Sequence, residues 1–230
     1  MLSIEQHIER HAQNAPERVA MVLNGEELTY AELRQRTMLR AQHYQGMRRK
    51  GVVLRASCDA DFLISYFAVH VAGAVAVLLP AVATPEQTVR MEKALQGFCF
   101  PDGSADVLFT TGTTGAPKGV VIGTLAIVAS AENIVYGQDY RHDIRFVVPG
   151  QLNHLGCLSK VWATMLAGAT CCLMPKFDFN EFFCLLASCK EMSVGAFLVP
   201  SCIRMLTKFG GKQMEDAAIK LAFIETGGDA

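Results

Sequence analysis

The stretch Asp106-Val107-Leu108-Phe109-Thr110 is short and apolar, and it runs directly into Thr111-Gly112-Thr113-Thr114-Gly115-Ala116-Pro117-Lys118-Gly119. The first part predicts a buried β-strand, and the second predicts a loop that leaves the carboxyl end of that strand. Three glycines within eight residues let the backbone turn sharply and aim several N–H groups at one anion. Ligands of open α/β sheets bind at the carboxyl ends of strands. The stretch therefore predicts an α/β fold that carries a phosphate site.

The side chains of this loop are of the types that bind phosphate. Lys118 supplies a mobile positive charge. Hydroxyl donors come from Thr110, Thr111, Thr113 and Thr114. The loop is not a G-x-x-x-x-G-K-[ST] loop, because Lys118 precedes Gly119 and no Ser or Thr follows the lysine; nor does it match G-x-G-x-x-G. A flexible turn with a solvated lysine is the alternative interpretation.

Composition narrows the class of protein. The 230 residues are enough for one large domain or two small ones, and 51% of them are hydrophobic, which excludes an intrinsically disordered chain. Lys plus Arg number 21 against 22 for Asp plus Glu, giving a net charge of -1. Such a near-neutral net charge lacks the excess of basic residues that is typical of nucleic-acid-binding proteins. It also gives no reason to expect an anionic membrane as partner.

Cysteine spacing and the amino terminus indicate a cytoplasmic protein. None of the eight cysteines forms a C-x-x-C pair, so we expect buried, reduced thiols and no metal cluster. Residues 1–5 lack the basic-then-apolar pattern of a secretory signal. The twenty residues from Ile64 to Ala83 carry no formal charge, but Gly73 and Pro80 interrupt them. They predict a helix followed by a buried strand and no membrane span.

Helices and short strands alternate along the chain. Asn24-Gly25 predicts a hairpin between Arg18–Leu23 and Glu27–Tyr30, and Thr29-Tyr30-Ala31-Glu32 predicts a capping box. Further helices are predicted over 3–14, 30–44, 59–74, 85–95, 124–136, 155–167, 178–189 and 201–209. Further strands are predicted over 52–56, 75–79, 106–110, 120–122, 144–148, 169–174, 194–199 and 221–225. Strands separated by helices predict mostly parallel sheets flanked by helices.

Residues 110–119 closely resemble the phosphate loop of the adenylate-forming superfamily, which includes acyl-CoA synthetases, adenylation domains of peptide synthetases and luciferases. The resemblance extends over essentially the whole chain, in the family's order, and is greatest to compact acyl- and aryl-CoA ligases such as o-succinylbenzoate–CoA ligase. Leu28–Leu33 and Ala72–Pro80 also match the family. Asn153-His154-Leu155-Gly156 resembles its His-x-x-Gly type of motif, and Gly227-Gly228-Asp229-Ala230 resembles the strand end that passes under the adenine ring. The resemblance implies the fold of the N-terminal part of an acyl-adenylate synthetase.

The function implied by the resemblance is a two-step acid–thiol ligation. A small carboxylic acid attacks the α-phosphate of ATP, releasing pyrophosphate, and the acyl-adenylate then passes its acyl group to CoA or to a carrier-protein thiol. Lys118 is implied to be catalytic, and Thr114 to contact Mg²⁺. The implied nucleotide-binding residues are Thr110, Thr111, Gly112, Thr113, Thr114, Gly115, Lys118, Gly119, Gly227, Gly228 and Asp229.

The resemblance also implies an acid-binding role for His154 and Gly156. Amino-acid-activating domains carry Phe-Asp where His154 falls, so this chain favours fatty, aryl or other acyl acids over amino acids. A structural histidine that satisfies a helix amino terminus is the alternative for His154. The remaining histidines, at 7, 11, 43, 70 and 142, are expected to be structural or exposed.

The chain departs from the family pattern in identifiable places. Gly123-Thr124 stands where the family has Ser-His, and the Tyr-Gly-x-Thr-Glu motif does not occur in these 230 residues. The ribose-binding aspartate and the mobile C-terminal domain with its lysine are likewise missing from them. Residues 1–230 therefore resemble the N-terminal portion of an adenylation domain, from which we expect little or no activity alone. The alternatives are a non-catalytic nucleotide-binding or scaffold protein, and an α/β domain with a fortuitous loop.

Overall fold

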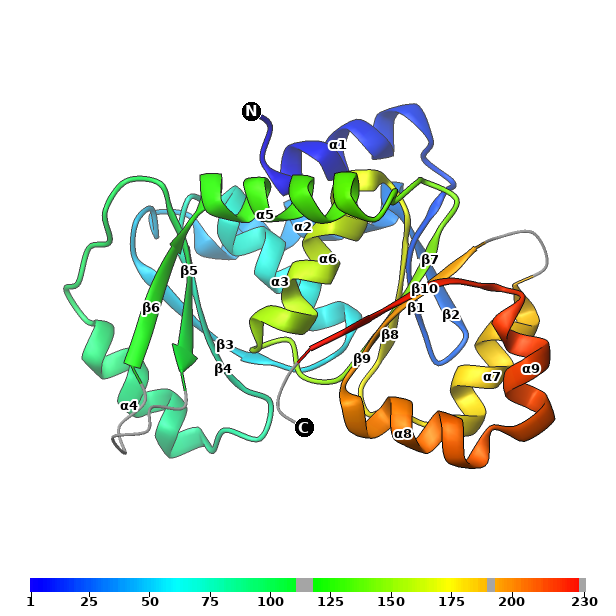
Figure 1. Ribbon diagram of the computed structural model, residues 1–230. Coiled ribbons are helices and arrows are strands. Elements are labelled where there is room, and N and C mark those ends of the chain that lie inside the picture. Colours follow the sequence, from blue (N-terminus) through cyan, green and yellow to red (C-terminus); the bar gives the residue numbers. More distant parts are fainter. Residues whose placement is uncertain (111–117, 190–192, 228–230) are drawn as a thin grey trace.

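Two β-sheets form the framework of the computed structural model, which describes residues 1–110, 118–189 and 193–227 (Figure 1). A six-stranded sheet has the order β10-β9-β7-β8-β1-β2, and a four-stranded sheet has the order β3-β4-β5-β6. The strands are β1 Val19–Leu23, β2 Glu26–Thr29, β3 Gly51–Ala56, β4 Val75–Pro80, β5 Ser104–Thr110, β6 Lys118–Gly123, β7 Arg145–Pro149, β8 Thr170–Met174, β9 Val194–Leu198 and β10 Leu221–Thr226.

Helices cover the sheets and fill the space between them (Figure 1). The helices are α1 Ile4–Asn14, α2 Tyr30–Ala41, the short 3₁₀ helix η1 Gln42–Tyr44, α3 Ala60–Val71, α4 Pro85–Leu95, α5 Thr124–Gly137, α6 Leu155–Ala167, α7 Phe179–Ser188, α8 Pro200–Phe209 and α9 Gly211–Ala218. The largest hydrophobic cluster joins inner faces of both sheets to α1, α2, α3, α5 and α6. A second cluster packs the six-stranded sheet on α7 and α8, and a third packs the four-stranded sheet on α4.

The α/β fold with mostly parallel sheets is confirmed. Each sheet contains one antiparallel pair, β1 with β2 and β5 with β6, and its other pairs are parallel. The predicted helices 85–95 and 155–167 have the observed bounds. The helix predicted over 59–74 is shorter, because Asp59 caps it and Gly73 follows it with a φ of 69°. Helix α9 was not predicted; its sequence begins with Gly211 and has no strong capping signal.

The turn and the capping box predicted within the first forty residues are both present in the structure. Asn24 and Gly25 adopt φ angles of 51° and 81°, as required in a tight two-residue hairpin turn. The Thr29 side chain accepts a hydrogen bond from the Glu32 backbone N–H at 3.2 Å, while Glu32 accepts one from the Thr29 backbone N–H at 2.9 Å. This capping box begins α2, and Ser3 with Gln6 forms another at α1.

The cysteines are free thiols, but their burial is mixed. Burial is found for Cys58, Cys157, Cys171, Cys172 and Cys189. The prediction of buried thiols is wrong for Cys99 and Cys184, which are exposed, and Cys202 is half-buried. Residues 64–83 form most of α3 and all of β4. Within the described ranges, no helix has the length and apolar character needed to cross a bilayer.

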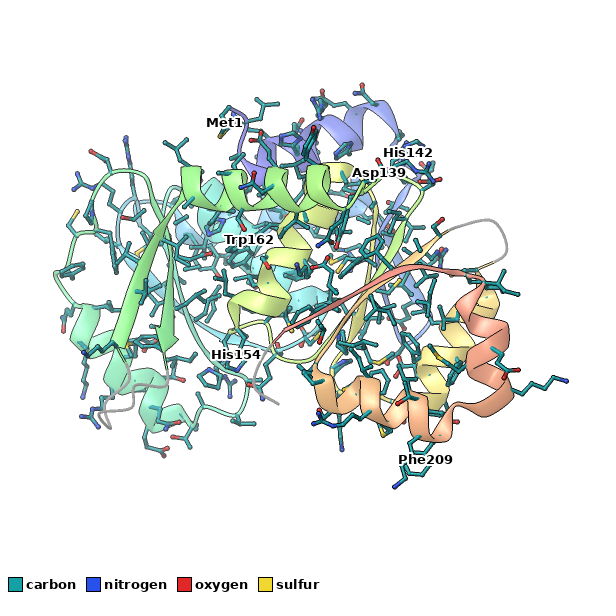
Figure 2. All side chains as sticks on the ribbon, viewed as in Figure 1. Met1, Asp139, His142, His154, Trp162 and Phe209 are labelled. Carbon is teal, nitrogen blue, oxygen red and sulfur yellow. The ribbon has the colours of Figure 1, made fainter. Side chains whose placement is uncertain are left out.

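A buried polar network connects α1, α3, β5 and α6. His70 lies between two carboxylates: its Nδ1 is 2.8 Å from Glu5 Oε1 and its Nε2 is 2.9 Å from Asp106 Oδ1. Tyr66 donates to Asp106 Oδ2 at 2.8 Å, and Trp162 Nε1 donates to the Tyr66 hydroxyl at 2.8 Å. Figure 2 shows Trp162 in the interior between the sheets. The prediction that His70 is structural agrees with this position.

The charge state of His70 follows from its neighbours. Burial by itself lowers the pKa of His70, but the charges of Asp106 and Glu5 outweigh burial and raise this pKa to about 10. Burial raises the pKa of Glu5, and the charge of His70 more than reverses that effect, so the Glu5 pKa is lowered. The imidazolium is therefore the form that the folded protein stabilises at neutral pH.

Replacing His70 with Gln is expected to lower the free energy of unfolding by about 3–5 kcal/mol at pH 6, because it leaves buried carboxylates without their cation. The folded pKa lies above the ordinary value of 6.5, so the stabilisation is complete below pH 6.5 and is lost as pH rises towards 10. Urea unfolding of both proteins at pH 6, 8 and 10 measures this. Substituting the exposed His142 with Gln is the control, and a His70→Gln deficit that stays constant across these pH values would contradict the charged-histidine assignment.

Candidate functional site

The two ends of the predicted phosphate loop meet at the carboxyl end of β5. Thr110, the last residue of β5, pairs with Lys118, the first residue of β6. Lys118 is exposed. The predicted loop residues Thr111, Gly112, Thr113, Thr114 and Gly115 lie outside the described residues, as do Gly228 and Asp229. The described part thus fixes where the loop begins and ends.

Lys118 and Gly119 belong to a strand, whereas the sequence predicted that the strand begins at Val120. The reason is the antiparallel pairing of β5 with β6, which extends to the last residue of β5. A Cβ atom on Gly119 would lie 3.1 Å from Val107 Cγ1 and 3.3 Å from the Phe109 ring. Gly119 therefore permits close packing on β5, in addition to the nucleotide-binding role predicted for it.

His154 stands immediately before helix α6. Its backbone is extended, with φ of -105° and ψ of 135°, and its side chain makes no capping hydrogen bond. His154 thus occupies the N-cap position, but its side chain does not satisfy the helix amino terminus as the alternative interpretation expected. The His154 side chain is exposed. One residue separates His154 from Gly156, whereas the His-x-x-Gly pattern has two residues between histidine and glycine. Figures 1 and 2 show His154 on the side of the molecule that the carboxyl ends of β5 and β10 also face.

The Phe197 ring, on β9, connects two of the predicted segments. A Cβ atom on Gly156 would lie 3.0 Å from Phe197 Cζ, and one on Gly227 would lie 3.5 Å from Phe197 Cε2. The ring is 8% exposed. Gly156 at the start of α6 and Gly227 after β10 thus contact the same buried ring. The structure brings together the segment predicted to bind the acid and the segment predicted to pass under adenine.

A buried ion pair lies beside that ring. Lys160 Nζ pairs with Glu225 Oε2, and both side chains are 10% exposed. The Tyr140 hydroxyl donates to Glu225 Oε1 at 2.8 Å, and burial, followed by the charge of Glu225, raises the pKa of Tyr140. Lys160 Nζ also lies 5.8 Å from the centroid of the Phe197 ring. These contacts tie β10 to α6 two residues before Gly227.

Asn153, directly before His154, is buried at 8% exposure. Its Oδ1 has no hydrogen-bond partner among the described residues. Buried polar atoms in folded proteins are nearly always satisfied. Asn153 Oδ1 is thus an exception that the described residues leave unsatisfied.

Sequence reasoning missed Phe197, Lys160, Glu225 and Tyr140. Lys160 does carry a signal, because it is the only formal charge in the apolar run Leu155–Ala167. A lone charge on an otherwise apolar helix indicates a buried partner. Among the described residues, no three His, Cys, Asp or Glu side chains converge as a metal site. The Mg²⁺ prediction rests on Thr114, outside that part of the chain.

The chain belongs to the AMP-binding enzyme family, whose model matches residues 98–230, more than half of the sequence. That matched region contains the phosphate-loop stretch, His154, Gly156 and Gly227. Membership of the adenylate-forming superfamily, predicted from the loop and the accompanying motifs, is confirmed.

Several of the curated relatives are CoA ligases. The 2-succinylbenzoate–CoA ligase, chloroplastic/peroxisomal, of Arabidopsis thaliana is 38% identical over 77 residues, covering 34% of this chain and 14% of the relative. The long-chain-fatty-acid–CoA ligase FadD13 of Mycobacterium tuberculosis is 28% identical over 139 residues, covering 54% of this chain and 27% of the relative. The chain thus spans about a quarter or less of the length of these relatives.

The fold is also similar to that of a solved CoA synthetase. O-succinylbenzoate Coenzyme A synthetase (MenE) from Bacillus subtilis, in complex with AMP, superposes with a TM-score of 0.79 and 17% identity. The match covers 96% of this chain and 67% of that one. At this identity the likeness establishes the fold.

Replacing Lys160 with Met is expected to lower the free energy of unfolding by about 3–5 kcal/mol, because Glu225 remains buried without its cation. Adding Glu225→Gln removes the charge and preserves an acceptor for the Tyr140 hydroxyl, so the double variant should recover part of the loss. Urea unfolding of the four proteins in the double-mutant cycle measures the coupling, with the exposed Lys208→Met as control. Strictly additive losses would contradict a direct buried pair.

Proposed function

We propose that residues 1–230 form the N-terminal portion of the adenylation domain of an ATP-dependent acid–thiol ligase. The observation that carries the proposal is the family match to residues 98–230, which includes every segment predicted to touch nucleotide or acid. The packing of Gly156 and Gly227 on one ring supports a common site for the acid and adenine segments. The relatives named above, which are CoA ligases, support CoA as the thiol acceptor.

In the first proposed step, a carboxylate oxygen attacks the α-phosphorus of ATP. A new phosphorus–oxygen bond forms, the bond to the β-phosphate bridging oxygen breaks, and pyrophosphate leaves. Because both reactants are anions, their repulsion has to be offset and the charge on the leaving group stabilised. Lys118, at the exposed start of β6, would bring its positive charge to the phosphates from the carboxyl end of β5.

In the second step, a thiolate sulfur attacks the acyl carbon and AMP leaves. His154 would contact the acid through its exposed imidazole, beside the Gly156 backbone that packs on Phe197. The Asn153 amide oxygen, buried and unpartnered within the described ranges, would accept a hydrogen bond from a group bound there. The presence of His154 where amino-acid-activating domains have Phe-Asp favours acyl or aryl acids over amino acids as substrates. The proposed location of the protein is the cytoplasm.

Binding of Mg–ATP to residues 1–230 tests the nucleotide site. We expect saturable binding, with Lys118→Ala weakening it about tenfold or more, because a hydrogen bond to a charged group contributes about 1.5–3 kcal/mol. Isothermal titration measures both affinities, and Lys208→Ala, an exposed lysine on α8, is the matched control. Absence of saturable binding by any adenine nucleotide would overturn the proposal, and equal affinities would remove Lys118 from the site.

The reaction itself is tested by acid-dependent exchange of labelled pyrophosphate into ATP, measured on the whole natural protein. Aryl and aliphatic acids are expected to support exchange, and amino acids are expected not to. Exchange with amino acids alone would overturn the assigned acid class. ATP binding without exchange for any acid in the panel would favour the non-catalytic nucleotide-binding alternative.

A further inference from the structure

A groove follows the open edge of strand β3. In the four-stranded sheet, β3 is the terminal strand, with β4 as its neighbour among the described residues. The groove encloses about 770 Å³, a volume within the usual range of ligand sites. It is remote in sequence from the segments assigned to nucleotide and acid. Its lining includes Gly51, Val52 and Val53 of β3 itself.

The walls of this groove, called here the β3 groove, come from opposite faces of the sheet. On one face, Tyr44 of η1 and Met47 pack with Val52 in the main core. On the other face, Leu95 of α4 packs with Val53 in the cluster over the outer side of the sheet. The strand edge therefore runs along the floor between two partly apolar walls.

The α4 wall of the groove exposes apolar side chains. Helix α4 contains no buried residue, although its Met91 and Leu95 pack partly against the sheet. Val89 on α4 is 47% exposed and Phe98, just beyond the helix, is 51% exposed. Both line the β3 groove. Large apolar side chains that remain exposed around one groove are a feature of interaction sites.

The backbone of β3 presents hydrogen-bonding groups to the groove. In a parallel ladder, alternate residues direct both N–H and C=O to the neighbouring strand. Val75 N–H donates to the Lys50 carbonyl, and the register pairs Val52 with Ala76. This pattern directs Val52 and Leu54 to β4 and leaves the N–H and C=O of Gly51 and Val53 facing the open edge. Such an edge is a template for an added strand.

The charges around the edge select among possible occupants. Residues 48–55 contain Arg48, Arg49, Lys50 and Arg55 and no acid. Lys50 and Lys93 line the groove with one acid, Glu92, and Arg49 is already paired with Asp102 at 3.4 Å. An antiparallel second copy centred on Val53 would place residue 51 opposite residue 55, and would bring the basic residues of both copies, Arg48, Arg49, Lys50 and Arg55, together along one short ladder. Repulsion between two segments that carry only positive charges disfavours self-pairing.

We propose that the β3 groove binds an extended, acidic segment of a partner protein, which adds to the four-stranded sheet as a fifth strand next to β3. The main chain of that segment pairs with Gly51 and Val53. Its successive side chains point in turn to the η1 wall and the α4 wall, so apolar residues at neighbouring positions pack against both walls. Its Asp or Glu residues lie near Lys50 and Lys93. This interaction is independent of the proposed ligase reaction.

A displayed library of random twelve-residue peptides, selected on the purified chain, tests the proposal. Enriched peptides are expected to contain a short run of neighbouring apolar residues and to carry Asp or Glu. Val53→Pro removes an N–H that faces the groove and leaves the β4 ladder intact. It should weaken binding of the enriched peptides at least about fivefold, as loss of one hydrogen bond does. Lys50→Glu with Lys93→Glu should weaken binding by a similar factor, whereas Lys208→Glu should not.

Cysteine footprinting locates the bound peptide without any substitution. Cys99 lines the groove and is exposed, and Cys184 on α7 is an exposed internal control. Bound peptide should slow alkylation of Cys99 and leave that of Cys184 unchanged. If Val53→Pro lowers the unfolding temperature markedly, the Lys50/Lys93 charge reversal and the footprint decide the question.

Three outcomes would overturn the proposal. The first is enrichment of basic peptides, or of none. The second is binding that neither Val53→Pro nor the charge reversal weakens, with no protection of Cys99. The third is a dimer in sedimentation analysis that Val53→Pro converts to monomer, which would assign the edge to a second copy of this chain.

Discussion

The imidazolium of His70, held between Glu5 and Asp106, is the interaction on which the arrangement of the molecule depends. It joins the first helix of the chain to α3 and to β5, and Tyr66 and Trp162 extend the same network to α6. These elements come from positions spread over more than 150 residues of sequence. Because β5 leads to the phosphate-loop stretch and α6 begins next to His154, one buried network orients both.

Buried charge carries a large desolvation penalty, so such a network is weak evidence for net stability. The network instead fixes geometry, because hydrogen bonds depend on direction. Only one relative placement of the helices and the strand satisfies the two carboxylates, the imidazolium, the phenol and the indole together. An apolar core tolerates sliding of packed elements more readily, because hydrophobic contact is not directional. The polar network thus supplies a constraint that the surrounding apolar cluster does not.

Much of the fold is predictable because its signals are local. The Thr29 capping box, the Asn24-Gly25 turn and the bounds of α4 and α6 each depend on residues within a few positions of one another. The Lys160–Glu225 pair joins residues 65 positions apart. No local sequence pattern around either residue indicates the other as its partner. The same holds for Phe197, whose importance comes from two distant glycines. The loop itself is predictable in identity, while most of its residues lie outside the described structure.

The second buried pair explains how two predicted site segments share one location. Lys160 lies on the helix that starts beside His154, and Glu225 lies two residues before Gly227. The pair therefore sets the position of the strand end relative to the helix start. The Phe197 ring lies between them, tightly against Gly156 and at ordinary contact distance from Gly227. A larger residue at position 156 would push the ring away and separate the two segments. The ion pair, the ring and the glycines act together. The relative placement of the segments predicted to bind acid and adenine therefore depends on packing beneath them as much as on the residues predicted to face a ligand.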